Sequence, residues 1–193
     1  MTRPPAPYEF VFRGLLAEEA LDRAGRPRKV IAGLFDADVA EKLSIDQLDQ
    51  DFVEVARRMA AVYVAVASFE NMARQLVTNV LLDAFGEGWW DAAVPAGVKK
   101  FATNRQAEEA KNKYHTQRGE APITYTELKH LENTIRANWQ HFEAFLPTLE
   151  WTASIFDAIE RSRNVIMHSG TLELEDIARV GINVRDWVVQ VGT

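Results

Sequence analysis

The sequence contains no cysteine and no long hydrophobic run. Without cysteine the chain can form neither a disulfide framework nor a thiolate metal site, and it suits a reducing compartment. Without a run of about 20 apolar residues, no segment is expected to span a membrane. The first ten residues, MTRPPAPYEF, also lack the apolar core of a secretory signal peptide. These absences predict a cytoplasmic protein that has no membrane partner.

The sequence also lacks an excess of positive charge: acidic residues outnumber basic ones by 28 to 22, and the formal net charge at pH 7 is −6. This balance argues against broad, non-specific binding to nucleic acid, although it is compatible with a local basic surface. The sequence contains neither GxGxxG nor GxxxxGK[ST], the glycine-rich loops that bind nucleotide phosphates. No group of cysteine and histidine has the spacing of a zinc site. We therefore expect no cofactor and no metal.

Helical periodicity is what the sequence does contain. In its longest stripe, apolar residues recur at steps of three and four, which is the spacing of one helix face. The stripe consists of Phe52, Val55, Met59, Val62, Val66, Phe69, Ala73, Leu76 and Val80. Ser44 and Gln47 have capping-box spacing and predict the start of this helix, and Gly86 predicts its end.

Shorter apolar stripes predict three more core helices, over residues 128–146, 151–166 and 177–191. We expect the first to begin at a capping box made by Thr124 and Glu127. Thr148 is expected to cap the second, and Gly170 to end it in the left-handed conformation. The last stretch includes VRDWVVQVG, which also suits a strand, although its spacing favours a helix.

Segments in which Val, Ile and Thr alternate with polar residues are missing elsewhere, so we predict an all-α fold. It would be a bundle of about four core helices with an N-terminal helical extension. Residues 1–50 form the extension, whose role the sequence does not reveal, and residues 51–193 form the bundle. Within the extension we expect a helix over 8–24 and a short, ambiguous helix over 30–43.

A polar segment, RNVIMH (residues 163–168), lies at the end of the stripe over residues 151–166, just before Gly170. Asn164 and His168 are four residues apart and share a helix face, and the long side chain of Arg163 can reach the same space. Val165 and Ile166 are expected to point into the core. A histidine can move a proton of a ribose hydroxyl, and an arginine can hold a phosphate and stabilise its developing charge. The segment is therefore a candidate site for RNA cleavage.

Spacing alone favours a simpler interpretation, in which these side chains form a polar helix rim. An arginine and a histidine five residues apart are a weak pattern. The same spacing recurs at Arg136 and His141, which flank Trp139 on the preceding helix. A pattern that occurs twice in one chain does not identify a catalytic site without further support.

The segment RNVIMH resembles the Arg/His signature of the HEPN superfamily, whose members are helical bundles and include many metal-independent endoribonucleases. The stretches FENMAR, FGEGWW and ITYTELKHLENTIRANWQHF occur in the order found in one subgroup, and the likeness covers roughly residues 52–180. That subgroup includes the C-terminal HEPN domain of an mRNA-surveillance endoribonuclease. The resemblance assigns the signature to Arg163, Asn164 and His168, and leaves Arg136 and His141 with a structural role.

The resemblance also implies partners and a cellular role. Two protomers of the family pair so that both signatures face one cleft, so we expect a homodimer that cleaves RNA at a composite site. Family association suggests a defence or toxin system and a possible regulatory partner protein. The alternative is a HEPN-like module that binds RNA or a protein without cutting it.

Two further groups of charges are candidates for a supporting part. In many HEPN proteins a charged pair on the long helix lies beside the signature, and Glu70 and Arg74 match it, although they are also an ordinary intrahelical ion pair. The basic stretch over residues 99–118 is the other candidate, either as a solvated helix face or as an RNA-binding surface. Its basic residues are Lys99, Lys100, Arg105, Lys111, Lys113 and Arg118.

Overall fold

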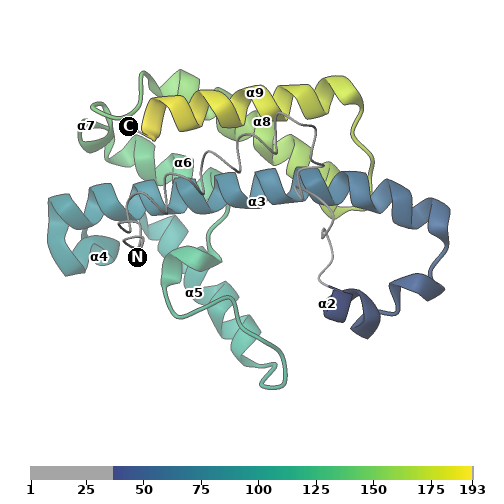
Figure 1. The fold of residues 1–193 in the computed structure, drawn as a ribbon. Helices are drawn as coiled ribbons and strands as arrows, with labels where there is room; N and C mark the ends of the chain where they lie inside the picture. The colour runs from purple at the N-terminus through teal and green to yellow at the C-terminus, as the bar shows by residue number, and fades with distance from the viewer. Residues whose placement is uncertain (1–36, 193) are drawn as a thin grey trace, which may run out of the picture. The chain divides into compact units, whose positions relative to one another are not determined.

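The computed structural model describes residues 37–192, which form helices and no strand (Figure 1). With η denoting a short 3-10 helix, the elements are α2 (Ala37–Lys42), η1 (Ile45–Gln47), α3 (Gln50–Phe85), η2 (Gly86–Gly88), α4 (Trp89–Ala93), α5 (Ala96–Ala110), η3 (Pro122–Tyr125), α6 (Leu128–Ala137), α7 (Trp139–Phe142), α8 (Leu149–Met167) and α9 (Leu174–Val191). The helix expected over residues 8–24 lies outside the described residues.

The chain divides into two compact units between Glu54 and Val55, inside α3. The sequence suggests a boundary a few residues earlier, between 50 and 51. The described part of the first unit holds α2, η1 and the first residues of α3. The second unit holds the remaining helices and every candidate site residue.

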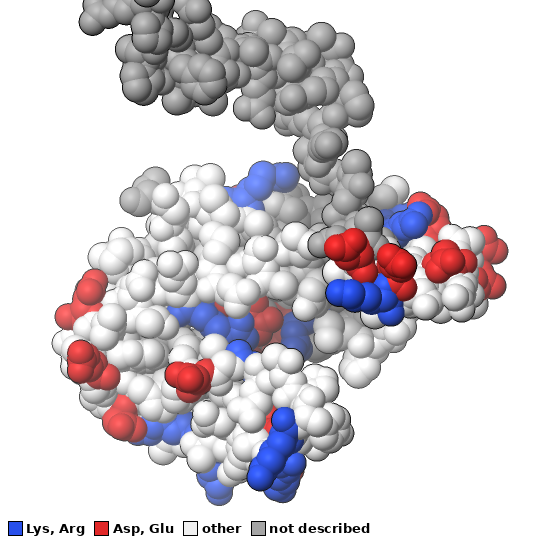
Figure 2. Space-filling view, turned by 60° about the horizontal axis from the view of Figure 1, so that its bottom comes forward, with Lys and Arg blue, Asp and Glu red and all other residues white. Residues whose placement is uncertain are grey.

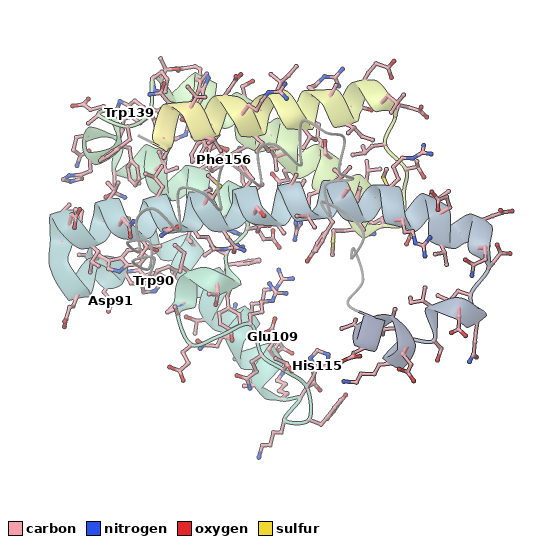
Figure 3. All side chains as sticks on the ribbon, viewed as in Figure 1. Trp90, Asp91, Glu109, His115, Trp139 and Phe156 are labelled. Atoms are coloured by element: carbon pink, nitrogen blue, oxygen red, sulfur yellow. The ribbon has the colours of Figure 1, made fainter. Side chains whose placement is uncertain are left out.

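The core of the second unit lies where α3, α6, α8 and α9 meet. Helix α8 packs against both α6 and α9. Phe69 of α3 makes edge-on ring contacts with Phe156 of α8 and Trp187 of α9, at centroid distances of 5.6 and 5.2 Å. Phe156 lies between α3 and α9 (Figure 3) and also contacts the ring of Trp187, at a centroid distance of 5.4 Å. Each such ring contributes roughly 1.5–3 kcal/mol by leaving water. The described residues form helices and no strand, and α3, α6, α8 and α9 share one core, so the predicted all-α bundle of about four core helices is confirmed.

The predicted stripe of α3 is buried from Met59 to Val80. Its first two members are not, because Phe52 is 75% exposed and Val55 is 44% exposed. The predicted start of the helix is also wrong. Ser44 makes no capping hydrogen bond with its side chain, whereas Asp49 Oδ1 accepts from the backbone N–H of Asp51 at 3.0 Å. An N-cap residue must lie immediately before the first turn, and Ser44 lies too early in the chain.

The tryptophan corner after α3 is more helical than the sequence suggests. Gly86 has a φ of 68°, which reverses the chain directly after α3, and the two tryptophans then begin α4. The rings of Trp89 and Trp90 pack edge to face with centroids 5.6 Å apart, and both residues contact the core. The corner therefore joins α3 to α5 by packing, as the apolar character of its side chains requires.

The segment expected to be one helix over residues 128–146 is two. Helix α6 ends at Asn138, whose side-chain amide donates to the carbonyl oxygens of Thr134 and Ala93 at 2.8 and 2.9 Å. Those bonds connect the break to the end of α4, and α7 follows. The predicted capping box is also displaced, because Glu127 is the N-cap residue and pairs reciprocally with His130. Thr124 instead donates to the carbonyl of Ala121.

Helix α8 begins as predicted and ends differently. The Thr148 hydroxyl accepts from the N–H of Trp151 at 3.0 Å, which confirms the predicted cap. At the other end the left-handed residue is Ser169, with a φ of 60°, and not Gly170. The N–H groups of Ser169 and Gly170 donate to the carbonyls of Ile166 and Val165, which is a Schellman arrangement shifted by one residue.

Gly170 is needed there for a different reason. A Cβ atom on it would lie 2.7 Å from Val165 Cγ1 and 2.9 Å from the Val165 carbonyl oxygen. The chain then turns toward α3, where the N–H of Leu172 donates to the sulfur of Met59 at 3.3 Å.

The ambiguous last segment is a helix, as its spacing favours, and it buries Val180 and Trp187. None of the helices in residues 37–192 combines the length and apolarity that crossing a membrane requires.

Candidate functional site

Helices α3 and α8 bring two arginines to opposite sides of one carboxylate. Glu70 Oε1 accepts from Arg74 Nη2 at 2.5 Å, and Arg163 Nε lies 3.7 Å from Glu70 Oε2. The side chains of Glu70, Arg74 and Arg163 are 12%, 17% and 29% exposed. Because solvent screens these charges only partly, the carboxylate holds both guanidinium groups in place more firmly than a surface pair would. We call these three residues the Arg–Glu–Arg cluster.

Arg74 is also anchored to parts of the chain outside this cluster. Its Nη2 donates to the carbonyl oxygen of Thr126 at 3.0 Å, and its Nη1 donates to Asn71 Oδ1 at 3.1 Å. Its Nε atom is buried and has no hydrogen-bond partner among the described residues. Arg74 therefore links α3 to the segment that follows η3, and most of its hydrogen-bonding capacity is already used.

The cluster lines a pocket of about 410 Å³, which we call the α3–α8 pocket. Arg118, from the loop after α5, is a third arginine in its wall. Tyr63 and Met167 contribute its exposed apolar surface, at 51% and 54% exposure. Figure 2 shows basic and acidic side chains close together in the hollowed middle of this face. The wall also includes Glu70 and Glu127, so its arginines exceed its carboxylates by one, and the pocket suits a ligand that carries negative charge.

The other two signature residues lie outside this pocket. Asn164 is exposed, and its Oδ1 is 3.5 Å from Arg163 Nη1, at the limit of a hydrogen bond. His168 is exposed at the C-cap of α8, with φ −102° and ψ 25°. Five residues on a helix correspond to a rotation of roughly 140°, so Arg163 and His168 point to different sides of α8. The expected common rim therefore holds Asn164 and His168, with Arg163 turned toward Glu70.

The apolar residues inside the signature also differ from expectation. Ile166 is half-buried against the core, as predicted. Val165 is 38% exposed, so the prediction that it points into the core is wrong. Ser162 takes the inward position instead, and its hydroxyl is satisfied by the carbonyl oxygen of Ala158 at 3.1 Å.

The basic stretch over residues 99–118 is largely paired with acidic groups. Arg105, Lys111 and Arg118 form ion pairs with Glu127, Glu108 and Glu109 at 2.6, 2.6 and 2.7 Å. The Lys99 ammonium donates to the carbonyl oxygen of Asp91, and Lys100 and Lys113 are exposed. Figure 3 shows Glu109 and His115 at the end of α5 that projects away from α9. Of the six basic residues only Arg118 lines the α3–α8 pocket.

The second arginine–histidine pair has separate packing contacts. Arg136 Nη2 bonds Glu132 at 3.0 Å, and the ring of His141 lies edge-on to Phe85 with centroids 5.1 Å apart. Burial opposes ionisation of Glu132, but hydrogen bonds from Lys129 and Arg136 outweigh it and hold the pKa of its carboxyl below the ordinary 4.5. Neither Arg136 nor His141 lines the α3–α8 pocket. These contacts are the ones expected of structural residues.

Sequence reasoning missed two pocket residues that periodicity can reveal. Tyr63 lies seven residues before Glu70, and Met167 lies four residues after Arg163, so each shares a helix face with a predicted residue. The sequence does not single out either residue, because exposed apolar side chains are common and carry no chemical signature.

Within residues 37–192, no group of three or more histidine, aspartate or glutamate side chains is arranged to hold a metal ion. No protein-family profile matches the chain, and neither a curated protein sequence nor a solved structure matches it.

Proposed function

We propose that the protein is a metal-independent endoribonuclease of the HEPN type, acting as a homodimer through Arg163 and His168. The single observation that carries the proposal is the position of Arg163. Its side chain points toward α3, where Arg163 Nε lies 3.7 Å from Glu70 Oε2. Arg163, Glu70 and Arg74 all line the α3–α8 pocket. A signature arginine held next to a charged pair on the long helix is what the resemblance of RNVIMH to the HEPN signature implies.

The chemistry follows from these two residue types. The ribose 2′-oxygen attacks the adjacent phosphorus, and the bond from phosphorus to the 5′-oxygen breaks. The 2′-hydroxyl loses a proton and the leaving 5′-oxygen gains one, so the products carry 2′,3′-cyclic phosphate and 5′-hydroxyl ends. His168 moves one of these protons, and Arg163 stabilises the extra negative charge on the phosphate.

The divergence of Arg163 and His168 supports a composite site. The two side chains point to sides of α8 about 140° apart by helical geometry. In a two-fold dimer, Arg163 of one protomer can instead face His168 of its partner, because the same surface occurs on both sides of the interface. We place this activity in the cytoplasm, and family association links it to defence or toxin systems.

One observation favours the second candidate, a HEPN-like module that binds RNA or a protein without cutting. His168 is exposed and does not line the pocket that contains Arg163. Without a partner to complete the site, the α3–α8 pocket would bind an anionic group and no proton transfer would follow.

The deciding experiment is incubation of the purified protein with RNA in EDTA, followed by mapping of the product ends. We expect cleavage by the wild type, with a loss of about 10²- to 10⁴-fold in His168→Ala. Arg163→Ala should lose a comparable factor, because removing a group that stabilises developing charge has a similar cost. His141→Ala is the matched control and should cleave normally. Binding without cleavage would favour the second candidate, and 5′-phosphate products or a need for added magnesium would contradict the mechanism.

A further inference from the structure

A second pocket lies between α8 and α9, with a volume of about 350 Å³. We call it the α8–α9 pocket. Its floor is apolar, because Leu172 and Val180 are buried and Ala158 and Val165 complete the surface. This volume falls within the range of small-molecule sites, which combine apolar walls with a few polar groups.

The charged groups of this pocket come from both helices. Arg161 lies on α8 and Arg179 lies on α9. Arg179 Nη1 forms an ion pair with Asp176 Oδ1 at 2.6 Å. Arg161 Nε donates to the carbonyl oxygen of its own helix at Asp157, and no carboxylate in residues 37–192 pairs with its guanidinium. The pocket therefore carries a net positive charge in a chain whose formal net charge is −6.

The pocket lies on the same side of α8 as His168. Arg161, Val165 and His168 are spaced four and three residues apart, which is one helix face. The Schellman turn after His168 places Leu172 in the floor of the pocket. The side chain of Arg163, by contrast, lines the α3–α8 pocket. The signature segment thus separates two positively charged pockets.

We propose that the α8–α9 pocket binds one nucleotide of the RNA strand next to the cleaved bond. The base lies on the apolar floor, and the phosphate binds Arg161 and Arg179. Arginine suits this task because its planar guanidinium stacks on bases and binds phosphate through two N–H groups. The identification of the ligand as RNA rests on the proposed function, whereas the pocket and its charge do not.

The first test measures binding of an RNA octamer with 2′-O-methyl groups, which cannot be cleaved because the attacking hydroxyl is blocked. Arg161→Gln should weaken binding about tenfold, the effect of losing one charge-assisted contact. Arg185→Gln removes the same charge from an exposed position of α9 outside the pocket and should change the dissociation constant less than about twofold. Equal affinity of Arg161→Gln and the wild type would overturn the inference.

A second variant tests the apolar floor. Ala158→Met fills the pocket with a residue that favours helix, and its fold is checked by circular dichroism. We expect weaker binding of the octamer, and smaller shifts of the Val165 and Leu172 amide resonances on addition of adenosine 5′-monophosphate. Equal shifts with inorganic phosphate alone would show that the floor holds no base, and binding of a polyglutamate peptide in place of the octamer would show a protein site. Either result contradicts the inference.

Failure of this inference can be distinguished from failure of the proposed function. If the wild type cleaves RNA in EDTA and Arg161→Gln cleaves with an unchanged KM, the function stands and the nucleotide subsite is wrong. If no cleavage occurs but adenosine 5′-monophosphate shifts the pocket resonances in an Arg161-dependent manner, the subsite stands and the nuclease is wrong.

Discussion

Among single residues, Glu70 is the one whose charge determines how two arginines are held. Glu70→Gln keeps the shape of the side chain and removes the charge that Arg74 and Arg163 share. We expect the free energy of unfolding to fall by about 1–3 kcal/mol, because two partly buried cations then face each other without a counter-charge. The measurement is urea denaturation. Glu108→Gln is the control: its pair with Lys111 is mostly exposed, so the change should be within about 0.5 kcal/mol.

Ser169 and Gly170 should respond to substitution in opposite directions. Ser169→Gly should raise the free energy of unfolding by about 0.5–1 kcal/mol, because glycine relieves the strain of the left-handed conformation. Gly170→Ala should lower it by about 1–3 kcal/mol, because the new methyl group overlaps the Val165 carbonyl. Thermal unfolding measured at one pH checks both values. Stabilisation by Gly170→Ala would mean that α8 ends differently.

Among the elements, the start of α6 depends on the protonation state of one histidine. The N–H of Glu127 donates to His130 Nδ1 at 3.2 Å, so the capping box requires a neutral ring. Burial lowers the pKa of His130 below 6.5; Arg105 lowers it further, while Glu127 and Glu160 oppose the shift. Because the folded pKa is depressed, the unfolded chain binds the proton first as the pH falls. The stability that the neutral His130 ring contributes is therefore complete above about pH 6.5, and it is lost progressively as the pH falls through the lower pKa of the folded state.

We therefore expect the free energy of unfolding to decrease as the pH falls from 7 toward 5, with a slope from this group of at most about 1.4 kcal/mol per pH unit. His130→Gln keeps an acceptor for the Glu127 N–H and should make the curve flatter. The same titration of His115→Gln, an exposed site on the loop after α5, should follow the wild type. Parallel curves for wild type and His130→Gln would show that the ring does not couple to folding.

At the scale of the whole molecule, the arrangement of Arg163 and His168 makes a prediction about the dimer. If each site takes Arg163 from one protomer and His168 from its partner, Arg163→Ala and His168→Ala are both inactive alone. A mixed dimer of the two variants contains one site with both residues intact. Mixing the inactive proteins should therefore restore up to about a quarter of the wild-type rate after random exchange of protomers, since half of the dimers are mixed and each has one of two sites.

The measurement is RNA cleavage in EDTA after incubation of the two variants at equal concentration. A mixture of Arg163→Ala with the double variant should stay inactive, which controls for contamination. If the mixture of single variants also stays inactive while sedimentation shows that protomers exchange, the two residues act within one protomer. A monomer at tens of micromolar would contradict the composite site itself.

The sequence alone determined the helical fold and most of its core. The three- and four-residue spacing of apolar side chains in α3, α8 and α9 is a property of one helix face, and it needs no knowledge of neighbouring helices. Thr148 was predictable for the same reason, because its hydroxyl bonds an N–H three residues away. The resemblance to the HEPN signature likewise depends on residue order alone.

The tertiary structure decided which face of α8 each signature residue occupies and what each contacts. Arg163 lies near Glu70, 93 residues earlier in the chain, and Asn138 ends α6 by bonding the carbonyl of Ala93 on α4. No local spacing predicts such contacts, because they depend on how separate helices pack. The end of α8 was missed by one residue for a related reason: the close approach of Gly170 to Val165 is a steric requirement that only the folded backbone reveals.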